Sequence, residues 1–187
     1  AIHLAGLSQA SGGTVQVLAE AGTALSTAAM ILECGPEDLS TKQAIFMGLL
    51  AETSPETILV TTSSAIVMSQ ILPDAIDQAR CLVAHPVNPP AILRVIEQVP
   101  APGTHCKITA RSADVFAAAG FTVVTLGHEV EGFVMNRLQS AVLREAYRLV
   151  DEGVTDVEGV DGIMRMALGP RDNGDGHIMR SRATSHP

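Results

Sequence analysis

The sequence predicts an α/β fold that gives way to an all-helical segment in its last third. Five short runs are rich in Val, Ile, Leu and Thr, as strands are, and they span residues 29–32, 57–62, 81–84, 93–99 and 121–126. Stretches with helical character separate several of these runs, and strands that alternate with helices usually build a parallel sheet. After Gly132 the strands stop, and apolar residues recur at spacings of three and four.

Proline and acidic residues mark the start of the first long helix. Pro36 fits the first helical position, because the N–H that proline lacks has no partner there. Glu37 and Asp38 would then lie in the first turn, where the helix dipole favours negative charge. We expect this helix to run through Lys42 to about Glu52.

Three further helices are expected downstream. The first spans about 112–119 and ends at Gly120, a residue suited to the left-handed position after a helix. The second follows Gly132 and runs to about Asp151. It carries a single apolar stripe, made of Met135, Leu138, Val142, Ala146 and Leu149. The third starts at a capping box over 155–158 and ends near 168–169.

The change from strands to helices places a domain boundary between residues 131 and 132. We expect a sheet domain over residues 1–131 and the beginning of a helical domain over 132–169. The last stretch, 170–187, is polar and has no apolar periodicity, which is typical of a disordered or unrelated tail.

Composition narrows the class of protein. Apolar residues make up 47% of the 187 residues, which is enough for a sizeable core. The net charge of −8, without a cluster of Lys and Arg, argues against a nucleic-acid surface. Three cysteines without CxxC spacing predict reduced thiols in a cytoplasmic protein rather than a metal site or a disulfide. No apolar run reaches the roughly 18 residues of a membrane span, and no signal peptide is recognisable.

Five local patterns occur in an order that is typical of one enzyme family. They are Glu33-Cys34-Gly35-Pro36-Glu37-Asp38-Leu39, Thr62-Ser63-Ser64, His85-Pro86-Val87-Asn88-Pro89-Pro90, the strand from Val95 to Pro100, and Gly132-Phe133-Val134-Met135-Asn136-Arg137-Leu138-Gln139. With them, the chain resembles the 3-hydroxyacyl-CoA dehydrogenase family from about Ala24 to Gly169. The sequence of the proline-rich turn, His85 to Pro90, is similar to that of the family's L-gulonate 3-dehydrogenase (lambda-crystallin) branch.

The resemblance implies a fold, a cofactor and a set of functional residues. The fold would be the second half of a Rossmann-type NAD-binding domain, followed by the start of an all-α C-terminal domain that holds substrate and the homodimer contact. The cofactor would be NAD, and the substrate a hydroxy acid or a hydroxyacyl-CoA. The positions matching the family's catalytic residues are Ser64, His85, Glu97 and Asn136, and those near the nicotinamide are Glu37, Lys42 and Thr62.

The chemistry of these residue types suits oxidation of a 3-hydroxy group to a 3-keto group. Such a reaction needs a base for the hydroxyl proton, and the unperturbed pKa of histidine lies nearest the working pH. A strand–turn–strand return could bring Glu97 beside His85, where the carboxylate would fix the tautomer of the ring. Ser64 and Asn136 could hydrogen-bond the reacting oxygen, Ser64 from beyond the carboxyl end of its strand.

One element that dinucleotide binding requires is not found. No G-x-G-x-x-G turn, which would place the pyrophosphate at a helix N-terminus, occurs in the sequence. We therefore expect an incomplete form of the enzyme, lacking the first unit of its cofactor domain and much of its helical domain. Two alternatives stay open: a non-catalytic, crystallin-like structural or interaction protein, and a gene model without a stable product.

Overall fold

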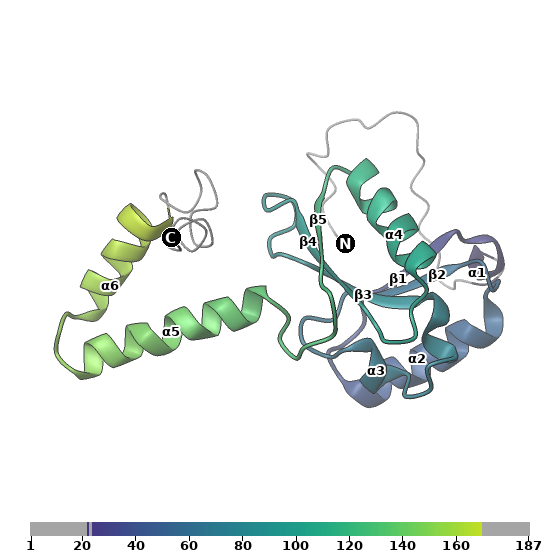
Figure 1. Cartoon of the computed structure of the whole chain (residues 1–187), viewed down its shortest axis with the longest axis horizontal. Coiled ribbons are helices and arrows are strands. Elements are labelled where there is room, and N and C mark those ends of the chain that lie inside the picture. Colours follow the sequence, from purple (N-terminus) through teal and green to yellow (C-terminus); the bar gives the residue numbers. More distant parts are fainter. Residues whose placement is uncertain (1–21, 23, 170–187) are drawn as a thin grey trace, which may run out of the picture. The chain divides into compact units, whose positions relative to one another are not determined.

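A computed structural model describes residue 22 and residues 24–169, and Figure 1 shows their arrangement. The chain divides into two compact units, with the division between Met135 and Asn136. The predicted boundary between residues 131 and 132 lies slightly before this division. The predicted tail, 170–187, lies outside the described residues.

The first unit is built on a five-stranded sheet in the order β1-β2-β3-β4-β5. Its strands are β1 (Met30–Glu33), β2 (Ile58–Thr61), β3 (Cys81–Pro86), β4 (Val95–Pro100) and β5 (Thr122–Thr125). The first three strands run parallel, β4 runs antiparallel to β3, and β5 runs parallel to β4. The sheet is therefore mixed and not purely parallel as expected. The connection from β3 to β4 is a short turn, whereas a parallel pair needs a crossover of roughly a dozen residues or more.

Helices cover both faces of this sheet, as the ribbon shows (Figure 1). The helices α2 (Leu39–Glu52) and α3 (Met68–Ile71) pack on one face, and α4 (Cys106–Ala118) packs on the other. Alternate strand residues point to opposite faces. Leu59 and Val83 thus belong to the core under α2 and α3, and Val60 and Leu82 to the core under α4. A single turn, α1 (Ala24–Thr27), precedes β1, and a 3-10 turn (Asp77–Arg80) precedes β3.

The start of α2 differs from the expectation. The helix begins at Leu39, and Asp38 is its N-cap, with its side chain accepting a hydrogen bond from the Thr41 amide at 2.8 Å. Pro36 and Glu37 therefore precede the helix and do not form its first turn. Because Glu37 lies in the preceding loop, its side chain is able to reach the segment after β2.

Two other helix starts were predicted wrongly, and one helix end was predicted correctly. The helix α4 begins at Cys106, six residues before the expected start. Ile108, in its first turn, packs against the core under α4 and so belongs to the helix. Gly120 follows its end with φ +85°, in the left-handed region as expected. At α6 (Val157–Ile163) the N-cap is Asp156 and not the expected capping box, since the Asp156 carboxylate accepts from the Gly159 amide at 2.8 Å.

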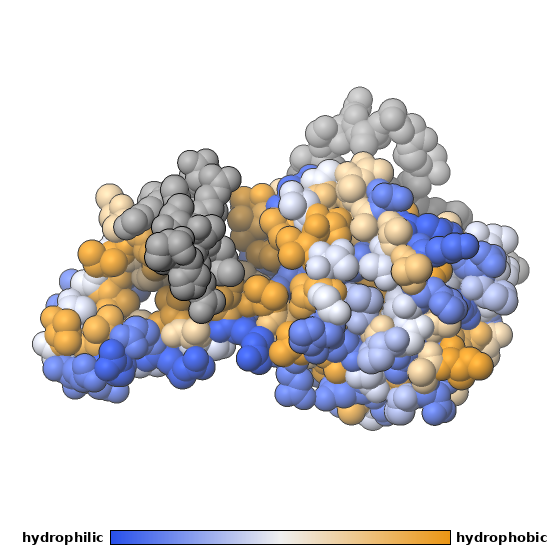
Figure 2. All heavy atoms as spheres, in the orientation of Figure 1, coloured by the Kyte–Doolittle hydropathy of each residue, from blue (hydrophilic) through white to orange (hydrophobic). Residues whose placement is uncertain are grey.

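Up to residue 169, where the description ends, the second unit is built from helices. It contains α5 (Met135–Asp151, whose first residue still belongs to the first unit), α6 and a π-helical turn (Met164–Leu168). No side chain of these helices is fully buried. Figure 2 shows the resulting apolar surface over α5 and α6, beside charged surface. A groove of about 370 Å³ lies between the two helices, and Val142, Ala146 and Leu149 of the predicted apolar stripe line it.

Candidate active site

A histidine and a glutamate meet on neighbouring strands of the first unit. His85 on β3 and Glu97 on β4 are direct partners in the antiparallel register, so their side chains lie on the same face. The Nδ1 atom of His85 lies 2.9 Å from Oε2 of Glu97, and both residues are buried. A carboxylate at this position accepts a hydrogen bond from the Nδ1–H group and leaves Nε2 as the nitrogen that can take up a proton. The predicted pair is thus formed.

The second oxygen of Glu97 binds the backbone at the start of α5. Its Oε1 atom accepts hydrogen bonds from the amides of Val134 and Met135, each at 2.8 Å. Only 4% of Glu97 is exposed, so these amides, together with His85, supply the partners that a buried carboxylate needs. The ring of Phe133, which is fully buried, lies 5.6 Å from the imidazole of His85 between centroids.

A second charged cluster lies at the carboxyl ends of β1 and β2. Lys42, which is 1% exposed, places its Nζ atom 2.9 Å from Oε2 and 3.2 Å from Oε1 of Glu33. The hydroxyl of Thr61 donates to Oε2 of the same carboxylate at 2.7 Å, and the amide of Gly35 donates to Oε1. These contacts join the end of β1 to the end of β2, to α2 and to the loop before α2.

Glu37 extends this cluster toward the surface. Its Oε2 atom lies 3.7 Å from Nζ of Lys42, and its side chain is 42% exposed. Its Oε1 atom accepts from the hydroxyl of Ser63 and from the amides of Ser64 and Ala65, at 3.0 and 3.2 Å. The carboxylate therefore binds the loop that follows β2 and holds Ser64 at the carboxyl edge of the sheet.

Hydrogen bonds and charge determine the ionisation of both acids. Burial raises the pKa of Glu33, but hydrogen bonds from Thr61, Lys42 and Gly35 and the charge of Lys42 outweigh it, so the pKa lies below its ordinary value. Burial also raises the pKa of Glu37. Hydrogen bonds from the loop after β2 and the charge of Lys42 lower it by more. Both side chains are therefore carboxylates at neutral pH.

The seven residues predicted for the site fall into three places. Glu37, Lys42 and Thr62 lie at the ends of β1 and β2, where Thr62 donates its hydroxyl to the carbonyl of Glu33 at 3.2 Å. Ser64 is exposed in the loop after β2, and α3 begins only at Met68, so the hydroxyl is not the cap of that helix. His85 and Glu97 form the pair described above. Asn136 belongs to the second unit, as the second residue of α5.

Sequence reasoning assigned no role in the site to two residues that these clusters contain, Glu33 and Phe133. Glu33 was read only as part of a motif, although an acid at the end of an apolar strand, nine positions before a lysine, indicates a buried pair. Phe133 was also interpreted only as part of a motif, because its contact with His85 depends on the tertiary fold. Lys42 was predicted from the resemblance; on its own it would be interpreted as a solvated helix lysine, and it is buried instead.

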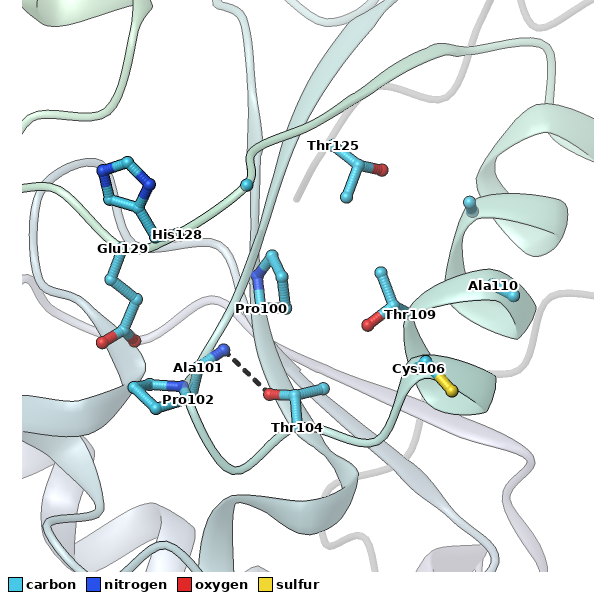
Figure 3. Close-up of a pocket in the computed structure, with 12 residues that line it drawn as sticks. Pro100, Ala101, Pro102, Thr104, Cys106, Thr109, Ala110, Thr125, His128 and Glu129 are labelled. Carbon is cyan, nitrogen blue, oxygen red and sulfur yellow. Dashed lines mark hydrogen bonds between the residues drawn. The ribbon is translucent and has the colours of Figure 1, made fainter.

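A separate hollow of about 560 Å³ lies at the opposite edge of the sheet (Figure 3). The loop after β4, the first turns of α4 and the segment after β5 line it, and the labelled side chains of Thr104, Cys106 and His128 show these three sources. Pro100 pairs with Leu82 at the start of β3, so this edge is the one away from His85. None of the predicted site residues lines this hollow.

Known proteins match this chain over most of its length. Residues 8–165 match the family model described as 3-hydroxyacyl-CoA dehydrogenase, NAD binding domain. The chain is 37% identical to the human (Homo sapiens) lambda-crystallin homolog over 148 residues, which are 79% of this chain and 46% of that protein. It is 34% identical to a 3-hydroxyacyl-CoA dehydrogenase of Gibberella moniliformis, with the same shares of the two chains.

A solved structure agrees with these matches. The structure of 5-formyl-3-hydroxy-2-methylpyridine 4-carboxylic acid 5-dehydrogenase, described as an NAD⁺-dependent dismutase, superposes with a TM-score of 0.83 at 28% sequence identity. The alignment covers 91% of this chain and 55% of that one. This chain therefore spans about half the length of the relatives that it matches. Across residues 22 and 24–169, no helix is both long and apolar enough to cross a membrane.

Proposed function

Because this chain belongs to the 3-hydroxyacyl-CoA dehydrogenase family, we propose that it carries the proton-transfer site of an NAD-dependent oxidation of a 3-hydroxy group to a 3-keto group. The observation that carries the proposal is the buried contact between Nδ1 of His85 and Oε2 of Glu97 at 2.9 Å. A base held in one tautomer by a buried acid is the part of such a site that the protein itself must supply.

His85 acts as the base in this proposal. The hydroxyl proton of the substrate passes to Nε2, and Glu97 stabilises the imidazolium that forms. Ser64 and Asn136, assigned by resemblance, bind the reacting oxygen. NAD, when bound, would supply the acceptor for the hydride of the substrate carbon.

The residues at the ends of β1 and β2 fit the nicotinamide end of the cofactor. Glu37 presents a half-exposed carboxylate beside Lys42, and a carboxylate can accept the N–H groups of a carboxamide. Thr62 is half-buried at the same edge, the one where open α/β sheets bind ligands. The sequence holds no glycine-rich turn for the pyrophosphate, so the fit concerns the nicotinamide end alone.

The substrate is a hydroxy acid or a hydroxyacyl-CoA. Two features favour L-gulonate over a hydroxyacyl-CoA. They are the proline-rich turn from His85 to Pro90 and the segment from Cys34 to Asp38, both of which resemble the L-gulonate branch of the family. The turn directly follows the strand that carries His85, so its side chains are well placed to contact a substrate.

The test is NADH binding and turnover by the 187-residue chain. NADH fluorescence is titrated with the chain, and NADH formation is followed with L-gulonate and with 3-hydroxybutyryl-CoA as substrates. Because the sequence holds no glycine-rich turn for the pyrophosphate, we expect the chain to bind NADH weakly, through the nicotinamide end alone. Any turnover should fall about 10²–10⁴-fold in kcat in a His85→Gln variant, with NADH binding unchanged. His105→Gln, which changes an exposed histidine before α4, is the matched control and should retain full activity.

Two outcomes would overturn the proposal. Full activity in the His85→Gln variant would exclude this residue as the base. A folded chain that neither binds NADH nor oxidises either substrate would exclude dehydrogenase function for these 187 residues.

A further inference from the structure

The backbone between β5 and α5 adopts an unfavourable conformation at a residue that is not glycine. Gly132 has φ +73° and Phe133 has φ +49°. Glycine adopts the left-handed region readily, but a bulky side chain does so only when its surroundings stabilise it. Phe133 also closes a turn, since its amide donates to the carbonyl of Val130 at 3.1 Å. The contacts of Phe133 therefore compensate for this conformation.

The compensating contacts converge on His85. Phe133 is 0% exposed, and its ring meets the imidazole at a centroid distance of 5.6 Å and an interplanar angle of 48°. The next two amides, those of Val134 and Met135, donate to Oε1 of Glu97 at 2.8 Å each. The other oxygen of Glu97 bonds Nδ1 of His85. The imidazole is thus held by a carboxylate and by an aromatic ring, and one short peptide segment fixes both.

From this geometry we propose that Phe133 is a positioning residue, which keeps His85 in the orientation that presents Nε2 to a substrate. The proposal rests on the proposed role of His85 as the base. A ring packed against the imidazole prevents it from rotating away from Glu97, and the left-handed backbone at Phe133 points the next two amides at the same carboxylate. Loss of the aromatic ring should therefore loosen the contact between His85 and Glu97 as well as the core.

A purely structural role for Phe133 predicts a different result. Phe133 belongs to the core under α2 and α3, so its truncation would destabilise the chain in either case. Phe116 provides a matched control, because it is a buried phenylalanine in the other core, on the opposite face of the sheet. Phe133→Leu and Phe116→Leu make the same chemical change in two cores, and only one of those cores contacts His85.

The measurement is the exchange of the Nδ1 proton of His85 with water, followed by NMR on the chain with ¹⁵N-labelled histidine. We expect exchange in Phe133→Leu to be at least about tenfold faster than in the unaltered chain, and exchange in Phe116→Leu to stay within about twofold, although both variants unfold more easily. We also expect the amides of Val134 and Met135 to exchange faster in Phe133→Leu, but not in Phe116→Leu. Equal exchange at His85 in the two variants would overturn the proposal.

A second variant decides the question if Phe133→Leu does not fold. Gly132→Ala keeps the aromatic ring but strains the left-handed backbone that aims the segment, so it should also speed the exchange at His85. Unchanged exchange in this variant would overturn the proposal. The NMR measurement needs neither NADH nor substrate, so it is independent of the activity test: failure of the proposed function would appear as absent turnover with a normal His85 signal.

Discussion

The two buried carboxylates of the sheet, Glu33 and Glu97, have partners of different kinds. Glu33 is bound by a lysine ammonium, a hydroxyl and one amide, all from the region around β1, β2 and α2. Glu97 is shared between a histidine ring and two amides from a distant part of the chain. The first cluster pairs a buried acid with a lysine ammonium. The second pairs a buried acid with an imidazole, the type of side chain that suits proton transfer.

The largest expected effect is a loss of stability when the cation of the first cluster is removed. Lys42→Met leaves Glu33 buried without its cation and should lower the free energy of unfolding by about 3–5 kcal/mol. Urea unfolding measures it, with Lys107→Met, an exposed lysine on α4, as the control. The double variant Glu33→Leu with Lys42→Met should recover much of the loss, because no charge is then left unpaired. A cost for Lys42→Met as small as that for the control would contradict the assignment of a buried ion pair.

A smaller effect is expected at Glu97. Glu97→Ala leaves the amides of Val134 and Met135 and the ring of His85 without their acceptor, and it should cost about 1–3 kcal/mol. Glu97→Gln keeps one oxygen that can accept the two amides, so it should cost less while abolishing the negative charge beside His85. Urea unfolding of the two variants gives the comparison, and equal costs would show that the amide contacts contribute nothing to stability.

The smallest effect is a gradual dependence of stability on pH in the first cluster. The pKa values of Glu33 and Glu37 are lowered in the folded chain, so the unfolded chain binds more protons in the acidic range. Their contribution to stability is therefore complete above the ordinary value of 4.5 and is lost as the pH falls through the folded values. Urea midpoints measured between pH 6 and pH 3, at roughly half-unit steps, should fall less steeply for Glu33→Gln than for the unaltered chain. Parallel curves would rule out a lowered pKa for Glu33.

Local sequence signals predicted the elements better than their ends. The β-branched runs located all five strands, and Gly120 marked the end of α4. The start of α2 was misplaced because three neighbouring residues, Pro36, Glu37 and Asp38, all suit a helix N-terminus, and only tertiary contacts decide which one caps it. Glu37 is bound by the loop after β2, which leaves Asp38 as the cap.

The candidate site was predictable where its residues lie on paired strands. A histidine and a glutamate separated by a turn suggested a hairpin-like return, and the register brings them together. The contact of Phe133 with His85 was not predictable from local signals. It depends on two chain segments far apart in the sequence, β3 and the segment before α5, and no spacing along the chain encodes that approach.

Because β4 returns antiparallel to β3, the turn between the two strands can vary in sequence, whereas the register of the strands cannot change. The amide of Val87 bonds the carbonyl of Val95 and closes the ladder just beyond the paired acid and base. Insertions or replacements between residues 88 and 93 would reshape the surface next to His85 without disturbing that ladder. A shift of register by a single residue would instead turn Glu97 to the opposite face. The turn can thus vary in sequence and shape, while the two strands beneath it keep His85 and Glu97 paired.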